Sequence, residues 1–242
     1  MTVRDLEIPL ASTPAWLLFR GSLEEAAARG TILFWHGFTA CKEVHEKELA
    51  SLAAHGYLAV GLDAVGHGAR RYADFDARFA GSGPAFDVPF LEAVRATAAE
   101  TPAVVEALRA HGAARPERLG LAGISMGALV AYRAALVERR ATAAACLLGS
   151  PRWRQPWPES PHLHAGRFFP LALLSQCAGA DQAVPPDAAR DFHAQLAPLY
   201  RAAPERLRYV EIPGVGHFMP EPQWQELWGN VLAWFDRFLA GA

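Results

Sequence analysis

Paired cysteines are lacking in this sequence. Its 242 residues include three cysteines, Cys41, Cys146 and Cys177, which are far apart and form no C-x-x-C motif. An odd and scattered set of this kind argues against a disulfide framework and indicates reduced thiols. We therefore expect a cytoplasmic protein whose hydrophobic core, at this chain length, is large enough to stabilise it without disulfides or metals.

Long apolar segments and an excess of one charge are also absent. No apolar run approaches the roughly 20 residues of a membrane-spanning helix, and the first ten residues carry Asp5 and Glu7 instead of the apolar core of a signal peptide. The chain has 23 Lys and Arg against 25 Asp and Glu, a net charge of -2, which argues against a dedicated polyanion binder. We expect neither a nucleic-acid partner nor a membrane partner.

Low-complexity composition is missing as well. The 20 glycines and 18 prolines together make up about 16% of the chain, below the roughly 25–30% that marks disordered sequences. No internal repeat, flexible linker or charge block divides the sequence. We predict a single domain over residues 1–242.

Apolar, β-rich segments alternate with helical patterns along the chain. Strands are predicted at residues 3–10, 16–19, 31–35, 57–62, 118–124, 143–148, 170–175 and 207–212. Helices are predicted at 44–55, 89–110, 128–139, 187–199 and 223–239, the second of them bent or broken at Thr101-Pro102. Continuous apolar strands between amphipathic helices predict an α/β fold, with a mostly parallel central sheet covered by helices on both faces. Functional groups gather at the carboxyl ends of the strands in such sheets.

The segment Gly-Ile-Ser-Met-Gly at 123–127 lies directly between a predicted strand and a predicted helix. This is a G-x-S-x-G motif in the strand–turn–helix setting that its chemistry requires, because a tight, strained turn holds the serine hydroxyl out of the sheet. The alternative is a glycine-punctuated helix start, which the two flanking elements make the weaker interpretation. Ser125 is the predicted nucleophile.

A serine hydroxyl needs a base that takes its proton and a carboxylate that orients this base. His217 follows the predicted strand 207–212 in a glycine-rich loop and is the best candidate base. Asp181 follows the strand 170–175 where a turn begins and is the predicted acid. Asp187 competes for this role, although it fits a helix N-cap better.

Other histidines have simpler interpretations than a catalytic role. Three lie within or at the end of predicted helices and are expected on the surface: His55, His111 and His193. His162 and His164 lie in a Pro- and Trp-rich loop, where they either face the substrate or are merely exposed.

Acyl transfer also needs donors for the oxyanion. One donor would be the backbone N–H of Met126, which follows the nucleophile. The other is expected from the loop after the strand 31–35, where Gly37 lets the backbone approach and Phe38 presents its N–H group. His36 in the same loop is expected to be structural.

Together these residues resemble the α/β-hydrolase superfamily over essentially the whole chain. The order Ser125, Asp181, His217 is the one found in that fold, and the segment 36–70 resembles small bacterial serine esterases near the dienelactone hydrolase branch. The resemblance implies the nucleophile, acid, base and oxyanion roles given above, and a structural loop at 63–68. Dienelactone hydrolases themselves use a cysteine where this chain has Ser125, and relatives carry a glycine where it has Ala178.

Two segments are expected to form a small cap over this site, residues 150–169 and 70–90. The first contains Trp153, Trp157 and Phe168, which we expect to form walls of the substrate pocket; the alternative is that they only pack the cap onto the body. A short cap with aromatic walls suits small acyl groups better than long lipids. No cofactor or metal motif is visible: the sequence His-Glu-Lys-Glu-Leu at 45–49 lacks the second histidine of a zinc protease.

The sequence therefore predicts a serine carboxylesterase that acts on small-molecule, short-chain acyl esters through an acyl-enzyme intermediate. Thioesterase, lactonase or peptidase activity at the same site is the first alternative. A non-catalytic binding protein with a hydrolase fold is the second. The sequence is compatible with a monomer and with a homodimer.

Overall fold

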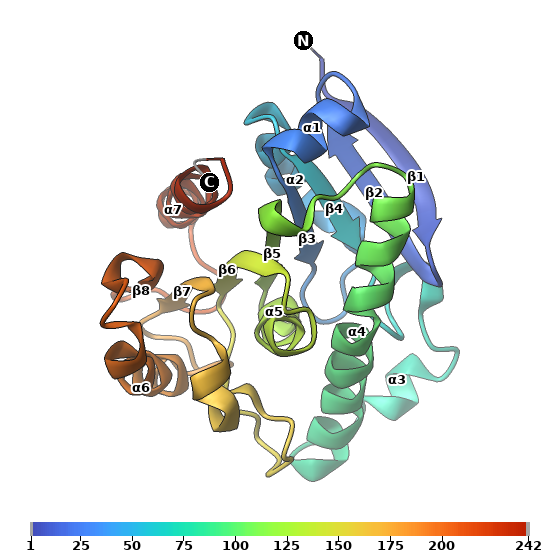
Figure 1. Ribbon diagram of the computed structural model, residues 1–242. Coiled ribbons are helices and arrows are strands. Elements are labelled where there is room, and N and C mark those ends of the chain that lie inside the picture. Colours follow the sequence, from blue (N-terminus) through green and yellow to red (C-terminus); the bar gives the residue numbers. More distant parts are fainter. Residues whose placement is uncertain (1, 241–242) are drawn as a thin grey trace.

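An eight-stranded sheet forms the centre of the computed structural model, which describes residues 2–240 (Figure 1). Its strands lie in the order β1-β2-β4-β3-β5-β6-β7-β8. β1 and β2 pair in antiparallel fashion, β2 is antiparallel to β4, and every pair from β4 to β8 is parallel. The strands are β1 Arg4–Leu10, β2 Thr13–Phe19, β3 Thr31–Trp35, β4 Leu58–Leu62, β5 Leu119–Ile124, β6 Ala141–Leu147, β7 Ala172–Ala178 and β8 Leu207–Ile212.

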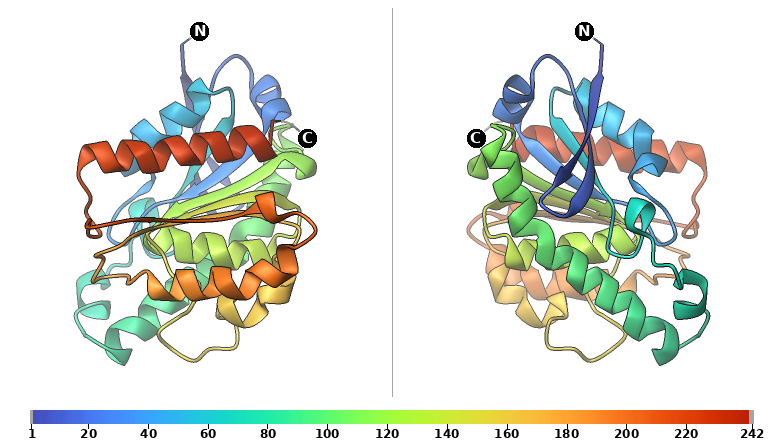
Figure 2. Two further views of the ribbon diagram at one scale, coloured as in Figure 1. Left: turned by 90° about the vertical axis from the view of Figure 1, so that its left-hand side faces the viewer. Right: turned by 90° about the vertical axis from the view of Figure 1, so that its right-hand side faces the viewer.

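Helices cover both faces of the sheet (Figure 2). They are α1 Leu23–Arg29, α2 Glu46–Ala54, α3 Phe75–Arg78, α4 Pro84–Ala110, α5 Met126–Val137, α6 Asp187–Leu196 and α7 Glu221–Phe238. Side chains of α4, α5 and α6 pack in one apolar core, and side chains of α2 and α7 pack in another. In β3, Leu33 and Trp35 point into the first core while Ile32 and Phe34 point into the second. Burial on both faces explains why these strands are apolar throughout.

The predicted fold class is confirmed, and each predicted strand overlaps an observed one. Helix α1 was not predicted, although the sequence carries its signal. Ser22 accepts a hydrogen bond from the Glu25 backbone while the Glu25 carboxylate accepts one from the Ser22 backbone, a capping box that is readable as S-x-x-E.

Of the predicted bend or break at Thr101-Pro102, the break is wrong. Helix α4 begins earlier than expected, at Pro84, and continues through Pro102 to Ala110. A proline inside a helix costs about 3 kcal/mol, but residues before and after it pack in the same core. Val94 and Ala98 lie on one side of Pro102 and Val105 on the other, all fully buried. Packing of this continuous face stabilises the helix across the proline.

His193 is buried, which contradicts its predicted surface position. Its exposure is 7%, and its Nε2 atom lies 2.7 Å from the Ser175 hydroxyl of β7. The buried residues of α6 are Ala189, Phe192, His193 and Leu196. Their spacing is that of one helical face, so the helical period would have placed His193 inward.

This burial predicts that acid weakens the fold. Desolvation lowers the pKa of His193 to about 4, whereas an unfolded histidine titrates near 6.5. Between these values only the unfolded chain binds the proton, so the stabilisation is complete above pH 6.5 and is lost as the pH falls to 4. The loss amounts to about 3 kcal/mol in the free energy of unfolding. Urea unfolding of the wild type and of His193→Gln at pH 7 and pH 4.5 measures this loss as the difference between the two proteins, because buried His36, with a pKa of about 4 as well, contributes to both. An equal pH dependence of the unfolding free energy in the two proteins would contradict the assignment.

Among residues 2–240, no helix combines the length and the apolar character that crossing a bilayer requires.

Candidate active site

Ser125 stands in a strained turn between β5 and α5. Its backbone has φ 56° and ψ -115°, a left-handed conformation that costs of order 1–3 kcal/mol in a non-glycine residue. The flanking glycines make the turn possible, because a Cβ atom on Gly123 would overlap the carbonyl group of Gly127, and one on Gly127 would overlap the carbonyl oxygen of Trp35. The Ser125 N–H donates to Leu147 O at 2.8 Å, which ties the turn to β6.

A continuous chain of hydrogen bonds joins Ser125, His217 and Asp181. The Ser125 Oγ atom lies 2.9 Å from His217 Nε2, and His217 Nδ1 lies 2.6 Å from Asp181 Oδ2. Because a carboxylate only accepts, Nδ1 carries the proton and Nε2 is left to accept the serine hydroxyl. The Asp181 side chain is buried, and its Oδ1 atom accepts N–H bonds from Ala183 at 2.9 Å and Val184 at 2.8 Å.

The sheet brings the acid and the base together. Asp181 follows β7 and His217 follows β8, which are parallel neighbours, so their carboxyl ends lie side by side. Two backbone hydrogen bonds join the loops that continue these strands: Gly179 N–H donates to Ile212 O at 2.8 Å, and Ala180 N–H donates to Val215 O at 2.9 Å. Strand order thus places residues that are 36 positions apart within bonding distance.

Asp187 takes no part in this chain. It is the first residue of α6, is exposed, and forms an ion pair with Arg190 at 2.7 Å. The predicted N-cap role is wrong by one position, because Pro186 is the N-cap residue. Its carboxylate still lies in the first turn, where the helix dipole favours negative charge.

The loop after β3 reaches the nucleophile. A Cβ atom built on Gly37 would lie 3.7 Å from the Ser125 Cβ, so only a few ångströms separate the two backbones. Within residues 2–240, neither the Phe38 N–H nor the Met126 N–H donates a hydrogen bond to a protein group. Both donors are available to a ligand next to Ser125, as an oxyanion site requires.

His36 anchors this loop, as expected from the sequence. It is fully buried, its Nε2 atom accepts the Ala64 N–H at 3.0 Å, and its Nδ1–H donates to Gly37 O at 2.7 Å. Burial lowers the pKa of His36 to about 4, so the ring is neutral and both bonds persist at neutral pH. The imidazole therefore fixes the backbone that precedes Phe38.

A cavity of about 520 Å³ opens beside Ser125 and His217. Apolar side chains form most of its wall, and they come from the loop after β3, from α4 and α5, from the 150–169 segment, and from the loop after β7 with the start of α6. The apolar lining residues are Phe38, Phe86, Phe90, Leu91, Met126, Leu129, Trp153, Ala183, Val184, Pro185 and Ala188. The polar ones besides Ser125 and His217 are Asp87, Ser150, Arg152, Arg154 and Asp187.

Of the three aromatic residues predicted to line the pocket, Trp153 does so. Trp157 packs edge-on against Trp153 at a centroid distance of 6.1 Å, outside the cavity wall. Phe168 is fully buried and packs on Phe192 of α6 at 5.1 Å. The pocket role predicted for Trp157 and Phe168 is therefore corrected: Phe168 packs the cap onto α6, and Trp157 packs against Trp153 within the cap and against the apolar core.

The second predicted cap segment contributes more to the wall than the sequence indicated. Phe38 contacts four phenylalanines of this segment with ring centroids 5.0–5.6 Å apart: Phe75, Phe79, Phe86 and Phe90. Phe86 and Phe90 also line the cavity. The start of α4 thus forms the wall above the Phe38 loop. His162 and His164 bond within their own loop, to Ser160 and to Pro158 O.

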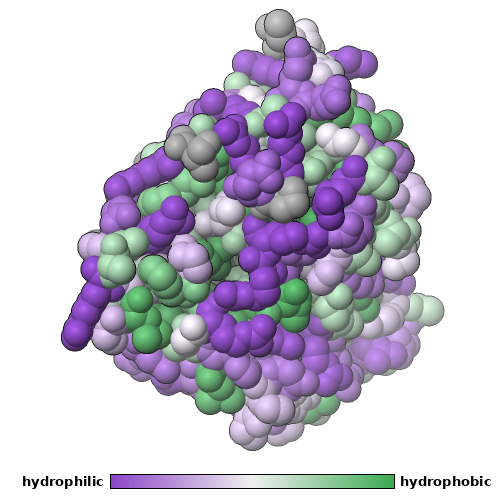
Figure 3. All heavy atoms as spheres, in the orientation of Figure 1, coloured by the Kyte–Doolittle hydropathy of each residue, from purple (hydrophilic) through white to green (hydrophobic). Residues whose placement is uncertain are grey.

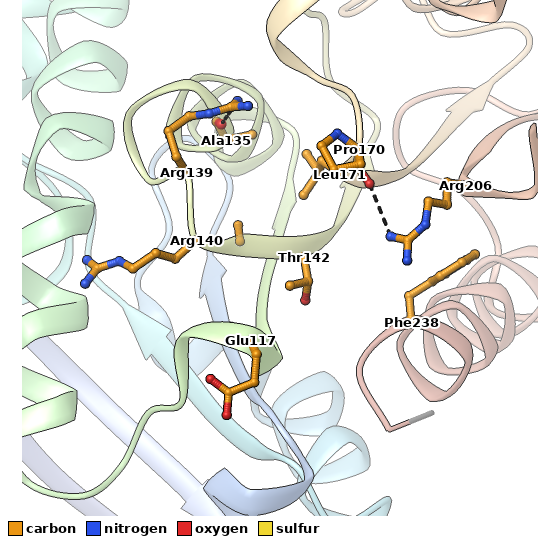
Figure 4. A pocket seen from close by; sticks show the side chains of 10 residues that line it. Glu117, Ala135, Arg139, Arg140, Thr142, Pro170, Leu171, Arg206 and Phe238 are labelled. Carbon is orange, nitrogen blue, oxygen red and sulfur yellow. Dashed lines mark hydrogen bonds between the residues drawn. The ribbon is translucent and has the colours of Figure 1, made fainter. Parts of the chain in front are cut away.

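A second cavity of about 380 Å³ lies at the opposite end of the strands, near their amino termini (Figure 4). Many of its lining residues lie at or just before the amino ends of β5, β6, β7 and β8, among them Glu117, Thr142 and Arg206. Arg206 donates to Pro170 O at 3.2 Å, and Figure 4 shows its guanidinium beside Phe238. Hydrophilic side chains dominate the face drawn in Figure 3. No serine, histidine or cysteine is among the described lining residues of this second cavity.

Metal-ligating side chains are not clustered in the described part of the chain: no group of three or more His, Cys, Asp or Glu there could hold an ion. The side-chain hydrogen bonds at Ser125 involve one imidazole and one carboxylate.

Solved structures with the same architecture include three that span this chain. A cold-adapted esterase from an Arctic intertidal metagenomic library is 20% identical, with 98% of this chain and 94% of that one covered and a TM-score of 0.73. A Klebsiella pneumoniae protein described as a dienelactone hydrolase is 18% identical, with 98% and 99% covered and a TM-score of 0.72. The Pyrococcus horikoshii acylaminoacyl peptidase is 18% identical, with 100% and 42% covered and a TM-score of 0.73. At these identities the likeness shows the fold. No curated protein matches the chain.

The amino-acid sequence also matches a family model. The model described as serine aminopeptidase, S33, matches residues 26–178, which is more than half of the chain. The matched span runs from α1 to the end of β7 and contains the Phe38 loop and the Ser125 turn. The chain therefore belongs to the serine aminopeptidase S33 family and is a hydrolase-fold protein of the α/β-hydrolase superfamily.

Proposed function

We propose that this protein is a serine hydrolase that cleaves short-chain carboxylic esters at Ser125. The observation that carries the proposal is the unbroken hydrogen-bond chain from Ser125 through His217 to Asp181 at the floor of an apolar cavity. A serine hydroxyl alone is a poor nucleophile, and an oriented imidazole is the base that activates it. The superfamily membership supports hydrolysis as the reaction class.

The proposed reaction proceeds in two halves. His217 Nε2 takes the Ser125 proton as Oγ attacks the ester carbonyl, and the N–H groups of Phe38 and Met126 bind the oxyanion. The imidazolium then protonates the departing alcohol, and an acyl group remains on Ser125. Water repeats the sequence with His217 as base and releases the acid. Asp181 stabilises the imidazolium and holds its tautomer throughout.

The size of the cavity supports a small substrate. A volume of about 520 Å³ lies within the roughly 300–1,000 Å³ of small-molecule sites, and much of its wall is rigid because Phe38, Phe86 and Phe90 pack on one another. Trp153 adds a further ring to the wall. These rings limit the length of the acyl chain that fits.

Hydrolysis of p-nitrophenyl esters across acyl chain lengths tests this proposal. We expect kcat/KM to be highest from acetate to butyrate and to fall by about tenfold or more for decanoate, because a longer chain must displace the packed rings. Values of kcat/KM for amide and thioester analogues of the best substrate show whether the protein prefers esters, amides or thioesters. The amide is included because the matching family is described as serine aminopeptidases. A maximum at decanoate would contradict the small pocket, and faster cleavage of the amide would make the protein a peptidase.

A further inference from the structure

Asp87 brings a nearly buried carboxylate into the cavity. It lies in the first turn of α4, is 8% exposed, and lines the same space as Ser125. Its Oδ2 atom accepts a hydrogen bond from Gln155 Nε2 at 3.4 Å, and its Oδ1 atom lies 3.6 Å from Arg154 Nη1. A carboxylate can accept about four hydrogen bonds, and both of these contacts are long. Asp87 therefore retains most of its capacity to bind a donor or a cation.

The other charged side chains of the cavity have closer partners. Asp187 pairs with Arg190 at 2.7 Å, and Arg152 lies 3.3 Å from Asp191. Both pairs are well exposed, so water screens them. Asp87 differs in burial and in the length of its contacts, and a desolvated charge without a close partner is costly.

Arg154 is a loosely held counter-ion for Asp87. Its side chain is 62% exposed, and its Nη2 donates to Ala183 O at 2.7 Å. The guanidinium thus bridges two walls of the cavity, α4 and the loop after β7. Because it is mostly in water and lies beyond hydrogen-bond distance of Asp87, a cation that enters the cavity can replace it at little cost.

Aromatic rings share the cavity wall with this carboxylate. Phe86 and Phe90 belong to the same helix as Asp87 and stack at 5.4 Å, and Trp153 lines the wall as well. Aromatic rings attract cations through their quadrupoles, more strongly when water is excluded. A carboxylate that shares a cavity wall with such rings is suited to bind a positively charged, partly apolar group such as an alkylammonium.

We propose that the cavity selects esters that carry an ammonium-type positive charge, which pairs with Asp87 in place of Arg154. This inference rests on the proposed ester hydrolysis at Ser125. The charge belongs either to the alcohol or to the acyl portion of the ester, since the chemistry at Asp87 is the same for both. The substrate class is thereby narrowed from short esters to cationic short esters.

Matched ester pairs that differ only in a quaternary nitrogen or carbon test the proposal. For the alcohol portion the pair is acetylcholine and 3,3-dimethylbutyl acetate. For the acyl portion it is the p-nitrophenyl esters of 4-(trimethylammonio)butanoate and 5,5-dimethylhexanoate. The readout is the ratio of kcat/KM for the cationic and the neutral member, and comparison between variants cancels intrinsic reactivity. We expect Asp87→Asn to lower this ratio about tenfold or more in at least one pair, which identifies the portion that carries the charge.

Two further variants separate this role from a structural one. Asp187→Asn removes the same charge from an exposed position of the same cavity and should keep the ratio within about twofold. Arg154→Gln removes the competing guanidinium and should raise the ratio. An equal ratio in the wild type and Asp87→Asn, or an equal loss in Asp187→Asn, overturns the inference. p-Nitrophenyl acetate, measured in parallel, tests the proposed function itself: turnover there with unchanged ratios refutes the cation site alone, and no turnover of any ester refutes both.

Discussion

Replacing Ser125 by alanine is expected to lower kcat for the best p-nitrophenyl ester by at least about three orders of magnitude. The variant has no Oγ atom, so no acyl-enzyme can form and His217 has no hydroxyl to activate. Residual turnover would come from the Phe38 and Met126 N–H groups, which still bind an oxyanion when water attacks directly. The rate of p-nitrophenol release measures the loss of turnover. The intact mass of the protein after treatment with a fluorophosphonate measures the loss of the reactive hydroxyl.

Labelling supplies the control for this variant. Ser150 lines the same cavity, but its hydroxyl bonds to the backbone of Arg152 and has no imidazole partner. The wild type and Ser150→Ala should each gain one fluorophosphonate adduct, whereas Ser125→Ala should gain none. Retained turnover or labelling in Ser125→Ala would place the nucleophile elsewhere. Labelling of the wild type without ester turnover would indicate an activated serine behind a more selective pocket.

The parts of the site that the sequence predicted well are those fixed by local geometry. The turn at Ser125 needs small residues at 123 and 127, because a Cβ atom there would overlap the Gly127 or the Trp35 carbonyl group. The five-residue motif between a predicted strand and a predicted helix therefore predicts the turn. The loops with Asp181 and His217 each follow a strand, and parallel pairing brings such loops together at the carboxyl ends of the strands. For these residues, strand prediction and chemistry were sufficient to expect the hydrogen bonds that the structure contains.

The cavity wall was predicted poorly because it depends on packing between distant segments. Trp153, Trp157 and Phe168 belong to one loop, and nothing local says which of them faces Ser125. Phe168 is buried because α6 presents Phe192 beneath it. The contribution of α4 was underestimated because the helix was predicted to begin at residue 89, whereas it begins at Pro84 and includes Pro89, which is locally unfavourable in a helix interior.

Asp181→Asn is expected to lower kcat by about four orders of magnitude while leaving the fold intact. An asparagine Oδ1 can still accept the N–H bonds of Ala183 and Val184, which turns its amide NH2 toward His217. That NH2 donates, so Nδ1 must accept and the imidazole proton moves to Nε2, where it blocks transfer from Ser125. The unfolding temperature should therefore change little.

Asp187→Asn is the matched comparison, because Asp187 was the other candidate for the acid and the variant removes the same charge. Asp187 pairs with Arg190, whereas the carboxylate that bonds to His217 is that of Asp181, so the loss of the Asp187 charge should change kcat by no more than a few-fold. Equal losses in both variants would mean that the charge of the cavity, and not the orientation of His217, controls the rate. A large loss in Asp187→Asn alone would transfer the acid role to that residue. Because the two side chains differ in burial and in their bond to Nδ1, the pair of measurements separates the tautomer effect from the electrostatic one.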